Sequence, residues 1–446
     1  MNYKNLLKPY LTQMDIALRK FVSINSVYDE TTITKEMPFG KGVDEALKFI
    51  GSLGEQYGFK VDYCDGYCTE LTIGDGDRLI GIYGHADVVP ISGNWSNPPF
   101  DCILKDGNYY GRGTSDDKGP VIAAFYALKA LKDNGMLDGY KVKFVVGGDE
   151  ERGSSCLEHY FEKLHKPYPD YGFTPDSDFP LIYGEKGIIN FYPELKVNVP
   201  QIKSIKGGVA TNAVCDRVEV VLNESINEFK EYLIINKVNC ESAGDVVTFL
   251  GKSAHGSTPE AGVNAALIAL KHLGEFFNVE EFKMIAEKLE DPSGKLFNGF
   301  ASTKLLGGTT YCLGIIDYEN GLLKFTINFR HPEGIDPLLY NENFNKEFGT
   351  TSTVSEPSPE LLYDPECKLV QTLLNAYRKE THDMSAPLTT GGGTYAKHSK
   401  NTIAFGALFP GRVSTMHEPN ELMPKEDFEL AAVIYARAIY DLGHIE

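Results

Sequence analysis

The sequence predicts an α/β protein, with a mostly parallel sheet in its main domain and an inserted α+β domain. Two observations lead to this prediction. From Arg78 to Ser154, apolar strand-like stretches alternate with glycine-rich loops and helical stretches, which is the order of a largely parallel α/β sheet. After Gly187 strand-like stretches and helices mix without that alternation. The chain has 446 residues, which is too long for a single hydrophobic core of typical size, so we expect at least two domains.

The elements of the first part follow from apolar periodicity and from turn residues. The helical stretches repeat apolar residues three and four positions apart, and Pro120 suits the first turn of one of them. Asp65-Gly66 indicates a turn between two short strands. We predict, in chain order, helices over Leu6–Val22 and Gly42–Tyr57, two strands within Lys60–Asp75, a strand over Arg78–Tyr83, a helix from Pro120 to about Lys132, a strand over Lys141–Val146 and a helix near Ser154.

In the later part of the chain, predicted strands and helices do not alternate regularly. Strand-like stretches over Arg217–Leu222, Asp245–Leu250 and Leu322–Phe329 stand among helices such as Gly262–Phe276, and Glu319-Asn320-Gly321 is typical of a hairpin turn. The last predicted elements are a linker at Ser355–Pro359 and helices over Glu366–Lys379 and from about Pro424 to Leu442.

Composition excludes several classes of function. The net charge of −19 argues against nucleic acid and anionic membrane surfaces as partners. No apolar run approaches the length of a membrane span, and the amphipathic stretch Met1–Lys20 lacks the apolar core of a signal peptide. We therefore expect a cytoplasmic protein, whose eight scattered cysteines serve as packing residues rather than as a zinc site.

Polar residues that could carry chemistry stand where the predicted strands end. His85 and Asp87 follow the strand Arg78–Tyr83, and residues i and i+2 of an extended chain point the same way. Open α/β sheets place their ligand sites at this end of their strands. The alternative interpretation is a histidine held by a neighbouring aspartate for structural reasons.

The complete set of such residues contains seven acids and two histidines, with few basic residues to offset them. They are His85, Asp87, Asp116, Asp117, Glu150, Glu151, Asp176, Asp178 and His417. If these carboxylates converge without cations, they repel one another and raise one another's pKa values. Two divalent metal ions would remove this conflict, and mixed imidazole and carboxylate ligands suit zinc, manganese or cobalt better than magnesium or calcium.

Each acidic pair also has an ordinary interpretation. Glu150 and Glu151 could lie on a solvated turn, and Asp116-Asp117 could cap the following helix. If the pairs are functional, the neighbouring side chains of Glu150 and Glu151 diverge. One of them would then be a metal ligand and the other a proton shuttle.

Five blocks together resemble the M20 metallopeptidase family. They are His85-Ala86-Asp87, Gly111-Arg112-Gly113-Thr114-Ser115-Asp116-Asp117-Lys118-Gly119, Asp149-Glu150-Glu151, Thr174-Pro175-Asp176 and His417-Glu418-Pro419-Asn420-Glu421. The long middle segment resembles the PepV-type dipeptidases of that family, which are related to carnosinases and aminoacylases. Further matching stretches are Gly208–Asn212, Lys252–Gly256, Asn328–Arg330 and Gly391–Thr394.

The resemblance implies a role for each acidic block. Asp116 would bridge two metal ions, just before a cis peptide bond to Asp117. The other ligands would be His85 and Asp176 for one ion and Glu151 and His417 for the other; Asp87 would orient the His85 ring, and Glu150 would be the general base. Asp178 remains the alternative to Asp176, because it stands only two residues further along the chain.

The resemblance also implies a catalytic domain made of residues 1–185 and 363–446, with a lid over residues 186–362. The lid would carry His255, Asn212 and Arg330, with His255 a catalytic donor and the other two binding substrate. Taken alone, His255 would be an ordinary surface histidine and Arg330 a member of a surface ion pair. The run Gly391–Gly393 lacks the spacing of a nucleotide loop and is interpreted as backbone that approaches a ligand closely, so Gly392, Gly393 and Thr394 are expected to bind substrate.

These implications amount to a metal-dependent dipeptidase acting on dipeptides with a free C-terminal carboxylate. Two divalent ions per subunit (zinc or manganese, with cobalt possible) would activate a water molecule, and Glu150 would accept its proton. The alternatives are another M20 amidohydrolase, such as an N-acyl amino acid deacylase or desuccinylase, and an inactive peptide-binding relative. The long insert would supply the lid histidine within one subunit, so we expect a monomer.

Overall fold

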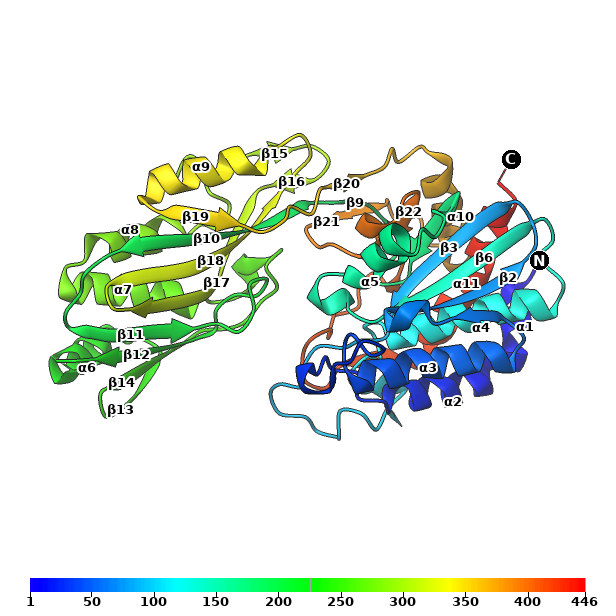
Figure 1. The fold of residues 1–446 in the computed structure, drawn as a ribbon, viewed down its shortest axis with the longest axis horizontal. Helices are drawn as coiled ribbons and strands as arrows, with labels where there is room; N and C mark the ends of the chain where they lie inside the picture. Colours follow the sequence, from blue (N-terminus) through cyan, green and yellow to red (C-terminus); the bar gives the residue numbers. More distant parts are fainter. Residues whose placement is uncertain (225, 446) are drawn as a thin grey trace. The chain divides into compact units, whose positions relative to one another are not determined.

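The computed structural model describes residues 1–224 and 226–445 and divides the chain into two compact units (Figure 1). Unit 1 comprises Met1–Tyr183, Tyr363–Leu388 and the chain from Thr394 onward, and unit 2 comprises Gly184–Leu362 and Thr389–Gly393. The last segment differs from the expected division, which left it outside the insert. It belongs with unit 2 because the amide of Lys186 donates to the carbonyl of Thr390 and Arg330 donates to the carbonyl of Gly391.

The largest sheet lies mainly in unit 1 and has nine strands. Its order is β1-β2-β6-β3-β7-β22-β9-β20, and β21 pairs with β9. The strands are β1 (Lys60–Asp62), β2 (Cys68–Gly74), β3 (Arg78–His85), β6 (Tyr140–Gly147), β7 (Tyr171–Thr174), β9 (Ile182–Glu185), β20 (Leu361–Leu362), β21 (Leu388–Thr390) and β22 (Thr402–Ala404). The four central strands β6, β3, β7 and β22 are parallel, whereas β1, β2, β9 and β20 pair antiparallel. The predicted sheet is therefore found, as a mixed sheet with a parallel centre.

The helices of unit 1 are α1 (Tyr3–Leu7), α2 (Leu11–Val22), α3 (Lys41–Gln56), α4 (Lys118–Asp133), α5 (Ser155–Glu158), α10 (Lys368–Thr381) and α11 (Lys425–Gly443). The predicted helix over Leu6–Val22 is interrupted by a 3₁₀ turn at Lys8–Tyr10, because Pro9 has no N–H to continue the α-helical ladder. Helix α4 is buried on all sides from Lys118 to Leu131 and packs against α11. Its burial fixes the loop before it, which carries Asp116.

Unit 2 has an eight-stranded antiparallel sheet in the order β13-β14-β12-β11-β17-β18-β10-β19. Its strands are β10 (Gly187–Lys196), β11 (Ile202–Gly207), β12 (Arg217–Leu222), β13 (Cys240–Ala243), β14 (Val246–Leu250), β17 (Thr310–Glu319), β18 (Leu322–His331) and β19 (Thr351–Val354), and its helices are α6 (Ile226–Ile235), α7 (Ala265–Phe277), α8 (Glu280–Lys288) and α9 (Pro337–Phe348). The predicted hairpin turn between β17 and β18 is confirmed: Asn320 and Gly321 both have positive φ, as a type I′ turn requires.

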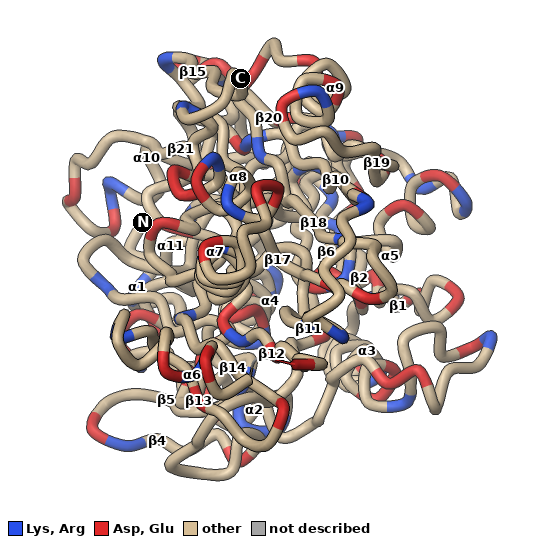
Figure 2. The backbone as a smooth tube through the Cα atoms, turned by 90° about the vertical axis from the view of Figure 1, so that its left-hand side faces the viewer, with Lys and Arg blue, Asp and Glu red and all other residues tan. Residues whose placement is uncertain are grey.

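Three small sheets complete the described structure. They are formed by β4 (Ile103–Lys105), β5 (Asn108–Tyr110) and β24 (Leu422–Pro424), by β8 (Ser177–Asp178) and β23 (Ala407–Leu408), and by β15 (Ser302–Thr303) and β16 (Gly307–Gly308). Acidic and basic residues are interspersed along the backbone (Figure 2). Among the described helices, none has both the length and the apolar character that crossing a membrane requires.

Candidate metal centre

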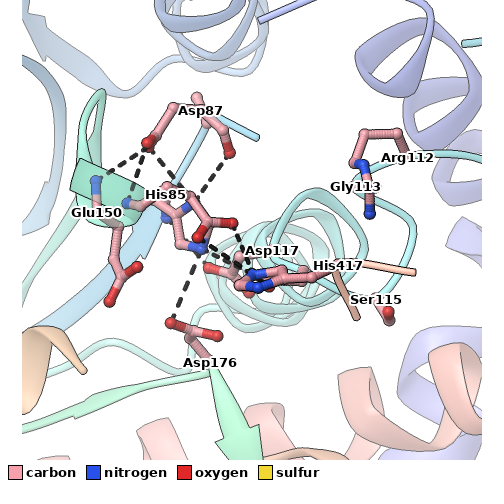
Figure 3. A network of polar contacts seen from close by, with 12 residues as sticks. His85, Asp87, Arg112, Gly113, Ser115, Asp117, Glu150, Asp176 and His417 are labelled. Carbon is pink, nitrogen blue, oxygen red and sulfur yellow. Dashed lines mark hydrogen bonds and ion pairs between the residues drawn. The ribbon is translucent and has the colours of Figure 1, made fainter. Parts of the chain in front are cut away.

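The parallel strands of unit 1 end at one edge of the sheet and deliver the predicted ligands there. His85 is the last residue of β3, Glu150 follows the end of β6 at Gly147, and Asp176 follows the end of β7 at Thr174. Because β3 pairs in parallel with both β6 and β7, their carboxyl ends lie side by side. Figure 3 shows the side chains converging at this edge.

Two groups of side chains there could each hold a metal ion. The first group is His85, Asp116 and Asp176, and the second is Asp116, Glu151 and His417. Within each group, one potential ligand atom per residue lies within 4.8 Å of the others. The structure therefore brings together all five side chains that the family resemblance implied as ligands, and it leaves Asp178 outside both groups.

Asp116 belongs to both groups and presents a different oxygen to each. Its Oδ1 lies 3.0 Å from Nε2 of His85, and its Oδ2 lies 2.9 Å from Nε2 of His417. The peptide bond from Asp116 to Asp117 is cis, as the resemblance implied. Asp117 stands at the N-cap of α4 but makes no side-chain cap; its Oδ2 accepts from the His85 amide instead, at 3.1 Å. The interpretation of this acidic pair as a side-chain cap of the helix is therefore wrong.

Asp87 contacts the centre differently from the expectation. The Nδ1 atom of His85 lies 3.0 Å from the main-chain oxygen of Asp87 and 3.4 Å from its carboxylate. That carboxylate accepts from the amides of Glu150 and Glu151, each at 3.1 Å. Asp87 thus fixes the His85 ring mainly through its main chain and uses its side chain to fix the turn after β6 (Figure 3).

The adjacent acids Glu150 and Glu151 diverge, as expected. Both oxygens of Glu151 lie 3.2 Å from Nε2 of His417, whereas Glu150 belongs to neither ligand group. Burial and the charge of Asp176 raise the pKa of Glu150 well above its usual range. A raised pKa makes a carboxylate a stronger proton acceptor.

Crowding of acids governs the electrostatics of the centre. Burial, with the charge of Asp116, raises the pKa of Asp176 to about 7. Burial opposes protonation of His417, but the charge of Glu151 and hydrogen bonds to Asp116 and Glu151 outweigh it and raise the pKa of His417 to about 11. Burial also opposes ionisation of Asp116, but its hydrogen bonds with the two histidines lower its pKa below the usual range. These groups fit divalent cations, which would offset the excess of negative charge.

The predicted residues of unit 2 form a group of their own. Arg330 is 2% exposed; its Nε donates to Oδ1 of Asn328 at 2.8 Å, and its Nη2 lies 3.4 Å from Nε2 of His255. Nδ1 of His255 lies 2.6 Å from Oγ of Ser257, and the amide of Gly256 donates to the carbonyl of Asn212 at 2.7 Å. The surface ion-pair interpretation of Arg330 is wrong, because the guanidinium is buried among these partners.

The glycine run contributes backbone to both units. Gly391, in unit 2, accepts from Arg330 through its carbonyl, and the amide of Gly392 donates to Oγ1 of Thr390 at 3.0 Å. Gly393 is exposed at the end of unit 2. Thr394, in unit 1, accepts from the Ala396 amide and starts the 3₁₀ turn Tyr395–His398.

Two buried charged residues beside the centre have no role in the predictions from sequence. Arg112 is 1% exposed and Glu421 is fully buried, and they form an ion pair of 2.7 Å. Arg112 stands four residues before the candidate ligand Asp116, and Glu421 stands four residues after the candidate ligand His417. The sequence could have indicated these two residues, because each stands in a loop that carries a candidate ligand. It could not have shown that they contact each other.

The comparisons with known proteins agree with this geometry. The family model described as "Peptidase family M20/M25/M40" matches residues 81–441. The chain belongs to this family. A relative from Staphylococcus epidermidis (strain ATCC 12228 / FDA PCI 1200), named "Putative dipeptidase", is 34% identical to this M20 chain over 478 residues, with 99% of both chains covered. "Putative dipeptidase YtjP" from Bacillus subtilis (strain 168) is 33% identical, with 95% of this chain and 96% of the relative covered.

Solved structures show the same fold. The crystal structure of human carnosine dipeptidase 1 matches with a TM-score of 0.64 and 14% identity, over 99% of this chain and 98% of that one. At this identity the likeness concerns the M20 fold alone. The α/β class with an inserted second unit, predicted from sequence, is confirmed.

We expect metal binding to release protons. A histidine must lose its proton to bind a metal ion, and His417 in the metal-free centre is protonated at neutral pH because its pKa is about 11. Affinity for Zn²⁺ should therefore rise with pH throughout the range below about 11. Calorimetric titrations of the metal-free protein in buffers of different ionisation enthalpy measure the released protons. A heat that is independent of buffer and an affinity that is independent of pH would contradict this assignment.

Proposed function

We propose that this M20 peptidase hydrolyses dipeptides that carry a free C-terminal carboxylate. The observation that supports this function most directly is the carboxylate of Asp116, whose two oxygens face two separate groups of ligands. The family match and the curated relatives support a metal-dependent dipeptidase.

We propose that Asp116 bridges two divalent ions. His85 and Asp176 would complete the ligands of one ion, and Glu151 and His417 those of the other. Zinc and manganese suit the mixed imidazole and carboxylate set, and cobalt is a further candidate. When bound, such a pair of ions polarises a scissile carbonyl and lowers the pKa of a water molecule.

Glu150 is the general base of the proposed reaction. Its amide is held by the Asp87 carboxylate, so the turn is fixed, while the Glu150 side chain is not required as a ligand. Its raised pKa lets it accept a proton from water and donate that proton to the leaving amine.

Unit 2 supplies the proposed recognition of substrate. Arg330 is a buried cation whose described partners are the side chain of Asn328, the Gly391 carbonyl and the His255 ring, none of them a carboxylate. We propose that it binds the C-terminal carboxylate of the dipeptide, with Asn212 and the backbone of Gly392, Gly393 and Thr394 as further contacts. His255 would donate to the carbonyl oxygen as it becomes tetrahedral.

The two units correspond, in this proposal, to a catalytic domain and a lid. The insert is long enough to carry the proposed histidine donor within the same chain, so we propose that the enzyme is active as a monomer. A cytoplasmic location remains a prediction from sequence.

The function is tested with substrates and with metal removal. Chelation should abolish hydrolysis, and Zn²⁺, Mn²⁺ or Co²⁺ should restore it, because the ligand set is a cluster of acids and imidazoles. The reconstituted enzyme should cleave dipeptides in preference to tripeptides, dipeptide amides and N-acyl amino acids. The proposal is wrong if full activity survives thorough demetallation, or if the N-acyl amino acids are the best substrates.

The variants Glu150→Gln and Glu151→Gln separate the roles of the adjacent acids. Glu150→Gln should lower kcat by roughly 10²–10⁴, the range for losing a general base, with metal content unchanged. Glu151→Gln should weaken metal binding instead, because Glu151 contacts His417 in the second group. Metal analysis of both purified variants, together with steady-state kinetics, checks the assignment. The reverse pattern would show that the two roles are exchanged.

The variants Arg330→Met and His255→Ala examine unit 2. Arg330→Met should raise KM for a dipeptide but not further impair turnover of the dipeptide amide, which lacks the carboxylate. His255→Ala should lower kcat by about 10²–10³, the usual effect of losing one oxyanion donor. Arg217→Met, an exposed arginine on β12, is the matched control. Wild-type kinetics in His255→Ala, or an equal loss on the amide in Arg330→Met, would count against these roles.

A further inference from the structure

We propose that Glu421 is a positioning residue that holds Asp116 and His417 in place for both metal ions. The inference rests on the proposed roles of Asp116 and His417 as ligands. Glu421 itself belongs to neither group of potential ligands, so its contribution would act through the residues it holds.

The carboxylate of Glu421 accepts from the backbone of the loop that presents Asp116. Oε1 accepts from the amides of Gly113 at 3.0 Å, Ser115 at 2.9 Å and Asp116 itself at 3.2 Å, and from the Ser115 hydroxyl at 3.2 Å. Several backbone N–H groups that converge on one anion fix the conformation of the loop that provides them. Glu421 thus determines where the backbone of Asp116 lies.

The same residue fixes the loop of His417, which precedes it by four positions. The main-chain oxygen of Glu421 accepts from the Gly111 amide at 2.9 Å, and the next residue, Leu422, donates to Oγ1 of Thr415 at 3.0 Å. The loop that carries His417 is thereby closed on itself and tied to the loop of Asp116. Glu421 therefore links the two loops: its side chain holds the loop of Asp116, and its main chain joins that loop to the one that carries His417, far away in the sequence.

The positive charge of Arg112 offsets the cost of burying the Glu421 carboxylate. Nη1 of Arg112 donates to Oε2 of Glu421 at 2.7 Å, and its guanidinium lies 5.3 Å from the centre of the Trp95 ring. Figure 3 shows Arg112, Gly113 and Ser115 on the side of Asp117 away from Asp87 and Glu150.

The competing explanation is that Arg112 and Glu421 form an ion pair that contributes only to the stability of the fold.

Substitution of Glu421 distinguishes these explanations. In Glu421→Gln, the amide nitrogen must face either the backbone N–H groups or Arg112, so one set of hydrogen bonds is lost in either orientation. In the double variant Arg112→Met/Glu421→Met, no buried charge is left unpaired, yet the amides of Gly113, Ser115 and Asp116 lose their acceptor. Glu418→Gln is the matched control, since Glu418 is an exposed glutamate of the same loop.

The measurement is a titration of each metal-free protein with Zn²⁺, alongside its melting temperature and its kcat at saturating Zn²⁺. Because Asp116 is shared by both groups, Glu421→Gln and the double variant should bind both ions roughly 10–100-fold more weakly, the usual cost of removing a group that orients a ligand. At saturating Zn²⁺, kcat should return to within several-fold of wild type. Glu418→Gln should match wild type in all three measurements.

The inference is overturned if Glu421→Gln binds Zn²⁺ as tightly as wild type, or if the double variant regains wild-type affinity together with its stability. The second result would show that the Arg112–Glu421 ion pair contributes only to the stability of the fold. Should the double variant not fold, the affinity of Glu421→Gln still decides the question. A wild-type protein that binds two ions but cleaves no dipeptide would contradict the proposed function and not this inference.

Discussion

The centre depends on one carboxylate, that of Asp116, lying between two imidazoles. Its oxygens are 3.0 Å and 2.9 Å from the nearest nitrogens of His85 and His417. Two elements fix this arrangement: β3 ends at His85, and the buried helix α4 anchors the loop that carries Asp116. Burial of Asp116 without the two histidines would raise its pKa, and their hydrogen bonds reverse that effect.

Much of this centre could be predicted from the sequence because the pattern of residues shows where the strands end. An apolar β-branched run that stops at a glycine and is followed by His85 and Asp87 shows both the strand and the side that it presents. The resemblance to M20 peptidases then implied five metal ligands, and the structure brings these five side chains together. Asp178, which stayed open as the alternative to Asp176, lies in neither group. Where the prediction was incomplete, the missing information was three-dimensional.

Strand direction is one such case. An apolar run shows burial but does not show whether a strand runs with its neighbour or against it, so the antiparallel pairing of β1 and β2 at one edge of the sheet could not be read from sequence. Glu421 is another. Its partners are backbone amides 305 and 306 residues away, and a main-chain donor leaves no trace in a sequence. The carboxylate of Asp87 likewise holds two amides that no pattern of side chains reveals.

The order in which the proposed ligands occur along the chain has a consequence for biosynthesis. Unit 2 is nearly continuous, from Gly184 to Leu362, and all eight strands of its antiparallel sheet lie in that stretch, so the sheet can assemble as soon as the stretch has left the ribosome. The centre in unit 1 cannot do the same, because His417 and Glu421 are synthesised long after His85 and Asp116. Until His417 has been synthesised, the carboxylate of Asp116 lacks the second imidazole that it contacts in the folded protein. The candidate centre can therefore be completed only after translation has passed Glu421, well after unit 2 can fold.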